Sequence, residues 1–256
     1  MSSDSAKIIV ERGAHGVVTV TLNRPEKSNA LDGESVDLLA DAIATVDRDP
    51  STRILALRAA GKHFSAGADV SSTGDSWSKP GRTIVDACTL LDNLSKPVVA
   101  IVQGACIGGG LALATCCDVV LATPDAFFAI PEVRLGVAPG PLTLFFIQAI
   151  PPRALRRYLI SGERISAERA LSFGLVHEIA ALAQIDLAFG RLIEALLQGA
   201  PTAIADAKRI RREQTRPQTE WMLSEMEADF RRRSSSPDAL EGLASFREKR
   251  PPRWSL

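Results

Sequence analysis

The sequence predicts an α/β fold that is followed by a helical C-terminal region. Up to about residue 141, short β-type runs alternate with segments whose apolar residues recur at helical spacing. Beyond Pro141 helical spacing dominates, and we expect only helices there. The chain has 256 residues, of which 46% are hydrophobic and 23% are charged. These values are typical of a soluble globular protein that folds without disulfides or a metal ion.

The N-terminal part begins with two β-type runs, residues 7–12 and 16–22, which predict a hairpin. After a polar turn, Asp32 or Gly33 begins an amphipathic helix that runs to about Val46. The same alternation predicts two further helices, one at residues 83–94 and one from the glycine triplet at 108–110 to about residue 116. It also predicts strands at residues 53–59, 97–102, 119–122 and 127–130.

The C-terminal part is expected to contain helices at residues 142–150, 153–161, 167–173, 182–198, 202–212, 219–233 and 237–249. The segment Gly199, Ala200 and Pro201 interrupts this periodic pattern. We therefore divide the chain into a core of residues 1–198 and a helical region of residues 199–256.

Charge and cysteine usage exclude several classes of function. Thirty Lys and Arg residues balance thirty Asp and Glu residues, which excludes a strong field for nucleic acid or an anionic membrane. The four cysteines and three histidines lack metal-site spacing, so we expect no metal and free thiols. Residues 1–7 lack the apolar core of a signal peptide, and the apolar stretch 104–123 contains three consecutive glycines and Asp118. We therefore expect a cytoplasmic protein without a membrane span.

Two glycine-containing turns, residues 64–70 and 104–110, each follow a predicted strand. Small residues let a ligand approach the backbone, and a helix start directs free N–H groups outward. Neither turn has the spacing of a P-loop or of a dinucleotide site. For either turn alone, tight packing of a helix on a strand is an equally good explanation.

Two further segments could carry chemistry. Glu132 follows Pro131 in an apolar context, although on local sequence alone a helix start explains it better than catalysis does. Residues 71–81 are rich in Ser, Gly and Pro, as functional loops often are, and a plain surface connection explains them equally well.

Taken in order, these segments resemble the enoyl-CoA hydratase/isomerase family, also called the crotonase superfamily. The resemblance covers nearly the whole chain, and the ordered set is far more specific than any one motif. Its segments are VTLNRP (20–25), NAL (29–31), FSAGAD (64–69), KPVVA (96–100), residues 104–118, PEVRLG (131–136), residues 161–162, residues 170–176 and FREKR (246–250).

The resemblance implies a crotonase-like spiral of β-β-α turns followed by a helical C-terminal region. It implies an acyl-coenzyme A thioester as substrate, so coenzyme A is part of the substrate and no separate cofactor is expected. It also implies a homotrimer or a dimer of trimers, with residues 199–256 as the oligomerisation region.

The resemblance also implies roles for particular residues. By position, the backbone N–H groups of Ala68 and Gly109 form the oxyanion hole for the thioester oxygen, and Glu132 is the catalytic acid/base. The matched positions that contact substrate or coenzyme A are Lys27, Ala30, Ser65, Ala66, Asp69, Gly108, Phe246 and Lys249.

One position departs from the pattern of the hydratases. They carry a second glutamate two residues after the glycine triplet, where this chain has Ala112. A methyl group cannot orient water or accept a proton. The sequence therefore favours enoyl-CoA double-bond isomerisation with Glu132 as the single acid/base.

Other functions remain open at this point. On the same scaffold they are hydration, decarboxylation and thioester hydrolysis. From another class, a non-catalytic acyl-CoA-binding protein is possible, although such a protein has no need of Glu132. Chain-length selection is expected from residues 71–81 and 139–146.

Overall fold

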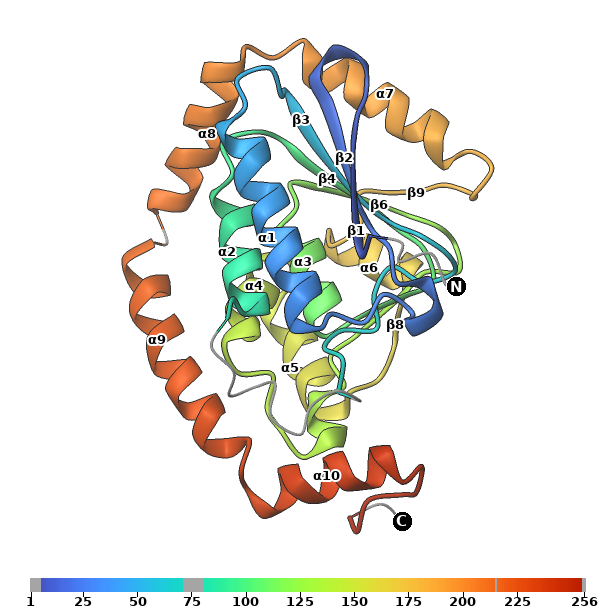
Figure 1. Ribbon diagram of the computed structural model, residues 1–256, viewed down its shortest axis with the longest axis vertical. Coiled ribbons are helices and arrows are strands. Elements are labelled where there is room, and N and C mark those ends of the chain that lie inside the picture. The colour runs from blue at the N-terminus through green and yellow to red at the C-terminus, as the bar shows by residue number, and fades with distance from the viewer. Residues whose placement is uncertain (1–5, 71–80, 215, 255–256) are drawn as a thin grey trace.

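The computed structural model describes residues 6–70, 81–214 and 216–254. The larger of its two sheets has the strand order β1-β2-β3-β4-β6-β9, and the smaller has the order β5-β7-β8 (Figure 1). The strands are β1 (Ile8–Arg12), β2 (Val17–Leu22), β3 (Ile54–Ala59), β4 (Val98–Val102), β5 (Ala105–Ile107), β6 (Val119–Ala122), β7 (Phe127–Ala129), β8 (Ile165–Ser166) and β9 (Glu178–Ile179).

The helices follow the predicted order. Short 3₁₀ turns are η1 (Ala14–Gly16), η2 (Pro25–Lys27), η3 (Glu132–Leu135) and η4 (Gly140–Leu142). The α-helices are α1 (Gly33–Arg48), α2 (Ile84–Asn93), α3 (Gly109–Thr115), α4 (Thr143–Ala149), α5 (Pro152–Ser161), α6 (Ala167–Phe173), α7 (Ile185–Leu197), α8 (Pro201–Glu213), α9 (Arg216–Arg233) and α10 (Pro237–Arg247).

The larger sheet combines the predicted hairpin with parallel strands. β1 and β2 are antiparallel, and the other neighbouring strands run parallel. β4 is buried on both faces because helices cover both. Its residues Val98, Ala100 and Val102 lie in the main core with α1, α2 and α3, whereas Val99 and Ile101 pack in a smaller core with α7 (Figure 1).

Two helix starts agree with their sequence signals. The carboxylate of Asp32 caps α1 by accepting a 2.8 Å hydrogen bond from the backbone N–H of Ser35. Thr83 and Asp86 form a reciprocal capping box at the start of α2. Local chemistry thus determines where both helices begin.

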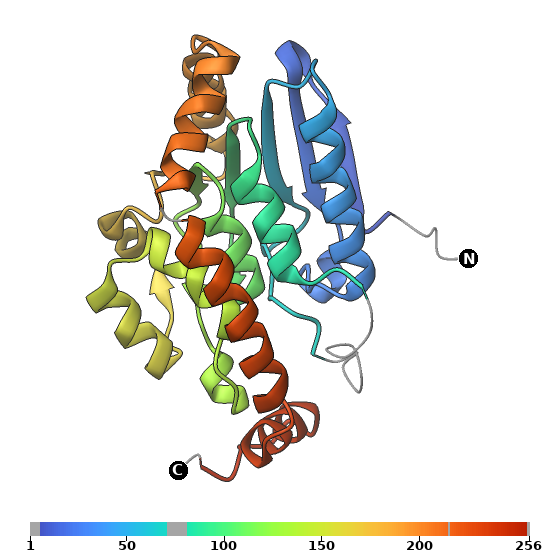
Figure 2. The ribbon, with the colours of Figure 1, turned by 90° about the vertical axis from the view of Figure 1, so that its left-hand side faces the viewer.

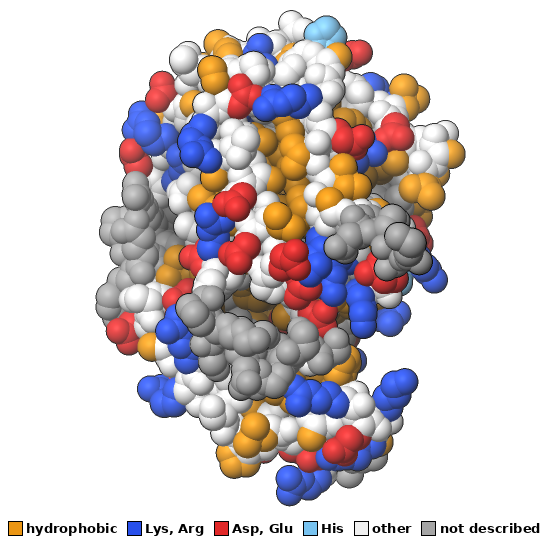
Figure 3. Space-filling model, viewed as in Figure 1, with side chains coloured by type: hydrophobic (Ala, Val, Ile, Leu, Met, Phe, Trp, Pro, Cys, Tyr) orange, Lys and Arg blue, Asp and Glu red, His pale blue; other side chains and the backbone are white. Residues whose placement is uncertain are grey.

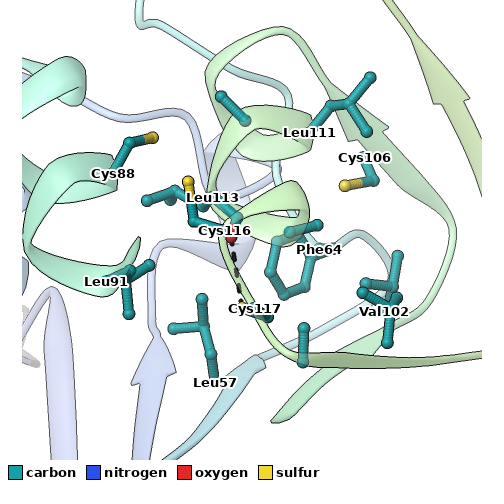
Figure 4. Close-up of a cluster of buried hydrophobic side chains, with 14 of the residues drawn as sticks. Leu57, Phe64, Cys88, Leu91, Val102, Cys106, Leu111, Leu113, Cys116 and Cys117 are labelled. Carbon is teal, nitrogen blue, oxygen red and sulfur yellow. Dashed lines mark hydrogen bonds between the residues drawn. The ribbon is translucent and has the colours of Figure 1, made fainter. Parts of the chain in front are cut away.

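The main core contains all four cysteines as free thiols, and Figure 4 shows them among buried side chains such as Phe64, Leu91 and Leu111. Burial raises the pKa of the Cys106, Cys116 and Cys117 thiols. A thiol that stays protonated is a poor nucleophile. These cysteines therefore act as small apolar core residues.

The prediction that only helices follow Pro141 is wrong. β9 adds the sixth strand of the larger sheet by pairing with β6, and β8 pairs with β7. β5, which the sequence placed within a turn, pairs with β7. Strands of two or three residues are too short to show an alternating pattern, so periodicity could not reveal them.

The last three helices lie at the periphery (Figures 1 and 2). No side chain of α8 is buried, and polar contacts attach this helix, such as that from Lys208 Nζ to the carbonyl of Lys96 at 2.9 Å. α10 instead packs backbone-close on η3, since a Cβ on Gly242 would lie 2.2 Å from the carbonyl oxygen of Leu135. No helix within the described residues is long and apolar enough to cross a bilayer.

Candidate active site

Two loops that are distant in sequence are joined by backbone hydrogen bonds. The carbonyl of Gly67 accepts from the N–H of Leu31 at 2.8 Å, and the N–H of Asp69 donates to the carbonyl of Leu31 at 3.0 Å. The N–H of Ala66 donates to the carbonyl of Ser28 at 2.9 Å. The turn after β2 and the turn after β3 therefore form one ledge, as short parallel strands do.

The second glycine turn lies directly beside this ledge. Ser65 exchanges backbone hydrogen bonds with Ala105 and Ile107, both at 3.0 Å. Gly110 permits the close approach, because a Cβ there would lie 2.6 Å from the Cβ of Ser65. The two glycine turns that the sequence singled out are thus brought together.

The predicted oxyanion-hole donors lie on these adjoining turns. Gly67 has φ +84°, and a Cβ on it would lie 3.5 Å from the backbone nitrogen of Gly109. Within the described part of the chain, neither the N–H of Ala68 nor that of Gly109 donates a hydrogen bond. Gly109 begins α3, where N–H groups have no acceptor within the helix.

Glu132 lies against the same turn. It follows β7 and begins η3, so the helix-start interpretation of Pro131–Glu132 also describes the local backbone. Gly108 has φ +51°, and a Cβ on it would lie 2.7 Å from Oε1 of Glu132. The carboxylate therefore lies directly beside Gly108, one residue before the proposed donor Gly109.

The electrostatics of Glu132 suit proton transfer. Its Oε2 is buried and has no hydrogen-bond partner among the described residues. Burial raises the pKa of Glu132 to about 7, and a hydrogen bond from its own backbone N–H opposes this only in part. A carboxyl group with this pKa can both accept and return a proton near neutral pH.

Apolar groups surround the donors. Ala112 is wholly buried on α3, and its N–H donates to the carbonyl of Gly108 at 2.9 Å. Ile84, at the start of α2, covers Gly109 so closely that a Cβ there would lie 2.7 Å from its Cδ1. The predicted loop at residues 71–81 lies outside the described residues, apart from Gly81.

The residues expected to contact coenzyme A differ in exposure. Lys27 is exposed on η2, and Ala30 and Ala66 are partly exposed beside it. Ser65 is wholly buried, and its hydroxyl donates to the carbonyl of Asn29 at 2.8 Å and accepts from the N–H of Gly67 at 3.1 Å. The side chain of Ser65 thus supports the ledge from inside.

The C-terminal pair of expected contacts lies at the end of α10. Phe246 is 52% exposed, and Lys249 is exposed with φ +53°. Within the described residues, no hydrogen bond or ion pair joins either residue to Lys27. Figure 3 shows a hollow between α10 and the body, with Lys and Arg side chains on both sides.

Sequence reasoning missed the buried amide of Asn29. Its Nδ2 donates to the carbonyls of Ala60 and His63 at 2.8 and 2.7 Å, and its Oδ1 accepts from the N–H of Arg24 at 2.8 Å. Asn29 has φ +53°, a conformation that asparagine tolerates better than most residues. The available signal was an asparagine in the polar turn after VTLNRP, since asparagine often hydrogen-bonds backbone groups in turns.

Among the described residues, no group of three or more His, Cys, Asp or Glu side chains is placed to hold a metal ion. The candidate site brings together the carboxylate of Glu132 and the N–H groups of Ala68 and Gly109.

Comparison with known proteins identifies the family of this chain. The sequence model of the enoyl-CoA hydratase/isomerase family matches residues 12–256. The chain belongs to the enoyl-CoA hydratase/isomerase family. Among its relatives in this family is the "Probable enoyl-CoA hydratase echA6" of Mycobacterium leprae, which is 31% identical over 245 residues, 94% of this chain and 96% of that one. The "Carnitinyl-CoA dehydratase" of Salmonella typhi is 32% identical over 249 residues, 93% of this chain and 94% of that one.

Solved structures of the enoyl-CoA hydratase/isomerase family confirm the predicted fold. An enoyl-CoA hydratase from Mycobacterium avium subsp. paratuberculosis superposes with a TM-score of 0.86 at 29% identity, over 98% of this chain and 99% of that one. An enoyl-CoA hydratase/isomerase from Pseudoalteromonas atlantica superposes with a TM-score of 0.88 at 26% identity, over 98% and 100% of the two chains. The α/β crotonase fold with C-terminal helices is therefore established, and with it a crotonase-family enzyme of acyl-CoA chemistry.

Proposed function

We propose that this chain is an enoyl-CoA isomerase that moves a carbon–carbon double bond with Glu132 as its single acid/base. One observation supports this proposal above others. The Glu132 carboxylate, whose Oε2 is buried and whose pKa is raised to about 7, lies beside an unpaired backbone N–H, while the wholly buried Ala112 offers no second carboxylate. Proton transfer between two carbons needs a base and an oxyanion hole but no positioned water.

The proposed reaction starts with the thioester carbonyl accepting hydrogen bonds from the N–H groups of Ala68 and Gly109. The Glu132 carboxylate removes a proton from C2 of a 3-enoyl thioester. The C–H electron pair then shifts toward the carbonyl oxygen and gives a dienolate, which the two donors stabilise. Glu132 returns the proton to C4, the double bond moves to C2–C3, and no atom is gained or lost. One oxyanion-hole donor typically contributes about 2.7–4 kcal/mol.

The coenzyme A portion is proposed to lie along the ledge. Ala30 and Ala66 are partly exposed on the ledge and the cation of Lys27 is exposed, whereas Gly108 is buried and its N–H and carbonyl bond to Ala129 and Ala112. Phe246 and Lys249, both exposed at the end of α10, would meet the nucleotide end, where a cation beside phosphate is favourable. Lys249 has φ +53°, a left-handed conformation that normally favours glycine.

We also propose that residues 199–256 form the oligomerisation region of a homotrimer or a dimer of trimers. The high exposure of α8 supports association, because a helix that buries no side chain fully in its own chain leaves apolar surface for a partner. Ile210 on α8 is 52% exposed and Leu240 on α10 is 59% exposed.

Hydration or dehydration is the second candidate, because the two relatives named above carry a hydratase and a dehydratase name. It requires Glu132 to orient water without help from position 112, or another group to do so. Decarboxylation and thioester hydrolysis would use the same donors.

The test incubates the protein with 2-enoyl and 3-enoyl-CoA thioesters in D₂O and identifies the products by mass spectrometry. Isomerisation predicts an unchanged heavy-atom formula and a moved double bond, with deuterium at C4 only to the extent that the proton held by Glu132 exchanges with solvent before its return. Glu132→Gln, which keeps the shape of the side chain, should slow this conversion by about 10²–10⁴-fold. A product that has gained one water at a typical enzyme rate of about 10 s⁻¹ would establish hydration instead. Binding without any turnover would identify an acyl-CoA-binding protein.

A further inference from the structure

We propose that Arg24 and Asp69 are positioning residues, which hold the Ala68 N–H in place as an oxyanion-hole donor. This inference rests on the proposed function and gives Asp69 a different role from contact with coenzyme A. It starts from the ion pair between Arg24, in the turn after β2, and Asp69, in the turn after β3. Asp69 directly follows Ala68, whose N–H is the proposed donor.

The backbone around Ala68 explains which way its N–H points. The residues on either side of it both bond to Leu31, one through the carbonyl of Gly67 and the other through the N–H of Asp69. In an extended segment, the N–H of the residue between two such bonds points to the opposite edge. The N–H of Ala68 is thereby directed away from Leu31, and it makes no hydrogen bond within the described residues.

Asp69 anchors this segment through its side chain as well. Its carboxylate is 7% exposed, and Oδ2 lies 3.2 Å from Nη2 of Arg24. The peptide unit that carries the donor is therefore adjacent to a residue that is fixed by both its backbone and its side chain.

Arg24 is itself held by several contacts within the segment between β2 and α1. Its Nη1 donates to the carbonyl of Ala30 at 2.6 Å and lies 3.2 Å from the carboxylate of Asp32, and its backbone N–H donates to Asn29 at 2.8 Å. A guanidinium group is a planar fork with fixed donor directions. Arg24 can therefore place Asp69 in one location relative to this segment.

The burial of the pair argues for positioning over stability. The side chain of Arg24 is 14% exposed, so the pair is largely removed from water. Buried ion pairs often add little net stability because desolvation offsets their attraction, but they fix geometry. Geometry is what an oxyanion hole requires, since a displacement of about 1 Å can cost roughly 10²-fold in rate.

The experiment compares Asp69→Ala and Asp69→Asn with Asp32→Asn as the matched control. Asp32 faces the same guanidinium but caps α1, and asparagine is an equally good helix cap. The probe is butyryl-CoA labelled with ¹³C at the thioester carbonyl, which has no double bond to move. Infrared difference spectra report how strongly the donors polarise the bound carbonyl, and the dissociation constant of coenzyme A reports binding.

We expect the carbonyl stretch to fall in frequency when the probe binds the parent protein. Asp69→Ala should lose most of this frequency shift, and its kcat for isomerisation of a 3-enoyl-CoA should fall by about 10–100-fold. Its dissociation constant for coenzyme A should stay within about twofold of the parent value. Asp69→Asn should lose less, because its amide oxygen can still accept from Arg24, and it serves if the alanine variant does not fold. Asp32→Asn should behave as the parent protein, because the carbonyl of Ala30 and the side chain of Asn29 still hold Arg24.

Three results would overturn the inference while leaving the proposed function intact. The first is an unchanged carbonyl shift in folded Asp69→Ala. The second is a weaker affinity for coenzyme A as the sole effect, which would mean that Asp69 contacts the coenzyme. The third is an equal loss in Asp32→Asn. By contrast, the absence of any carbonyl shift in the parent protein would overturn the proposed function itself.

Discussion

Different interactions stabilise the body of the molecule, which contains the two sheets, and its last three helices, α8, α9 and α10. In the body, β4 is buried on both faces and Ser65 is enclosed between two backbone-paired turns. α8 buries no side chain, and charged side chains such as Lys208 and Arg211 hold it in place. Apolar burial and backbone pairing fix the geometry of the candidate site, whereas α8 is held by polar contacts that water weakens. Changes in the body should therefore alter kcat, and changes in the C-terminal region should alter KM or stability.

The largest effect is expected at the carboxylate. Glu132→Gln keeps the size of the side chain but removes the base, so turnover should fall by about 10²–10⁴ while acyl-CoA affinity is retained. Steady-state kinetics and calorimetric titration with butyryl-CoA measure the two quantities. An unchanged rate would remove Glu132 from the mechanism and favour the acyl-CoA-binding protein.

The next effect tests how tightly the body constrains that carboxylate. Gly108→Ala places a Cβ about 2.7 Å from Oε1 of Glu132 at a residue with φ +51°. The carboxylate must shift, and we expect kcat to fall by about 10²-fold. Gly190→Ala on α7 is the matched control, because a Cβ there meets nothing within 4 Å. A Gly108→Ala enzyme as fast as the Gly190→Ala enzyme would refute the constraint.

The pH profile should report the raised pKa of Glu132. Because the base must be ionised, kcat/KM is expected to fall about tenfold for each pH unit below the pKa of about 7 and to level off above it. A profile that stays flat from pH 5 to pH 8 would contradict this prediction.

The same pKa shift has a consequence for stability. Native Glu132 keeps its proton up to about pH 7, whereas the unfolded chain releases it from about pH 4.5. The contribution of this group to stability is therefore present below pH 4.5 and declines as the pH rises through that window. Glutamine does not titrate, so Glu132→Gln lacks this pH-dependent loss of stability. The melting temperature of the variant relative to the parent should therefore increase between pH 4.5 and 7. Parallel melting temperatures across this range would exclude the shift.

A smaller effect is expected in the C-terminal region. Lys249→Ala should raise KM for acyl-CoA by about tenfold with little change in kcat, because a charged hydrogen bond contributes about 1.5–3 kcal/mol and the nucleotide end does not react. Measurements at low salt are the sharpest. An equal KM in variant and parent would show that Lys249 makes no phosphate contact, and a fall in kcat alone would contradict the division between the two regions.

The smallest effect concerns how α8 is attached. Lys208 is 10% exposed and pairs with Asp118, whose carboxylate also accepts from the N–H of Val98 at 2.7 Å. Lys208→Ala should lower the free energy of unfolding by about 1–2 kcal/mol in urea titrations. Arg232→Ala is the control, since its ion pair with Asp229 is exposed and should contribute under about 0.5 kcal/mol. Equal effects of the two variants would show that burial does not strengthen the Lys208 contact.

Much of the fold could be read from local patterns. The amphipathic spacing before Val46 and the cap at Asp32 mark α1, and the glycine triplet marks the start of α3. These features act between residues a few positions apart, so the sequence displays them directly. The oxyanion-hole positions and Glu132 came instead from the resemblance to a family, because a lone glutamate after a proline carries no catalytic signal of its own.

Tertiary structure decided the rest. β8 and β9 exist because β7 and β6 offer them hydrogen-bonding edges, and two residues carry no pattern that could announce such pairing. The raised pKa of Glu132 comes from desolvation, which depends on what the whole fold packs around it. Arg24 and Asp69 meet across 45 positions of sequence. By itself the sequence determined the order of the elements and the residue types at the site. Only folding determined the distances between those residues and how far water is excluded from them, since both are sums over neighbours that are remote along the chain.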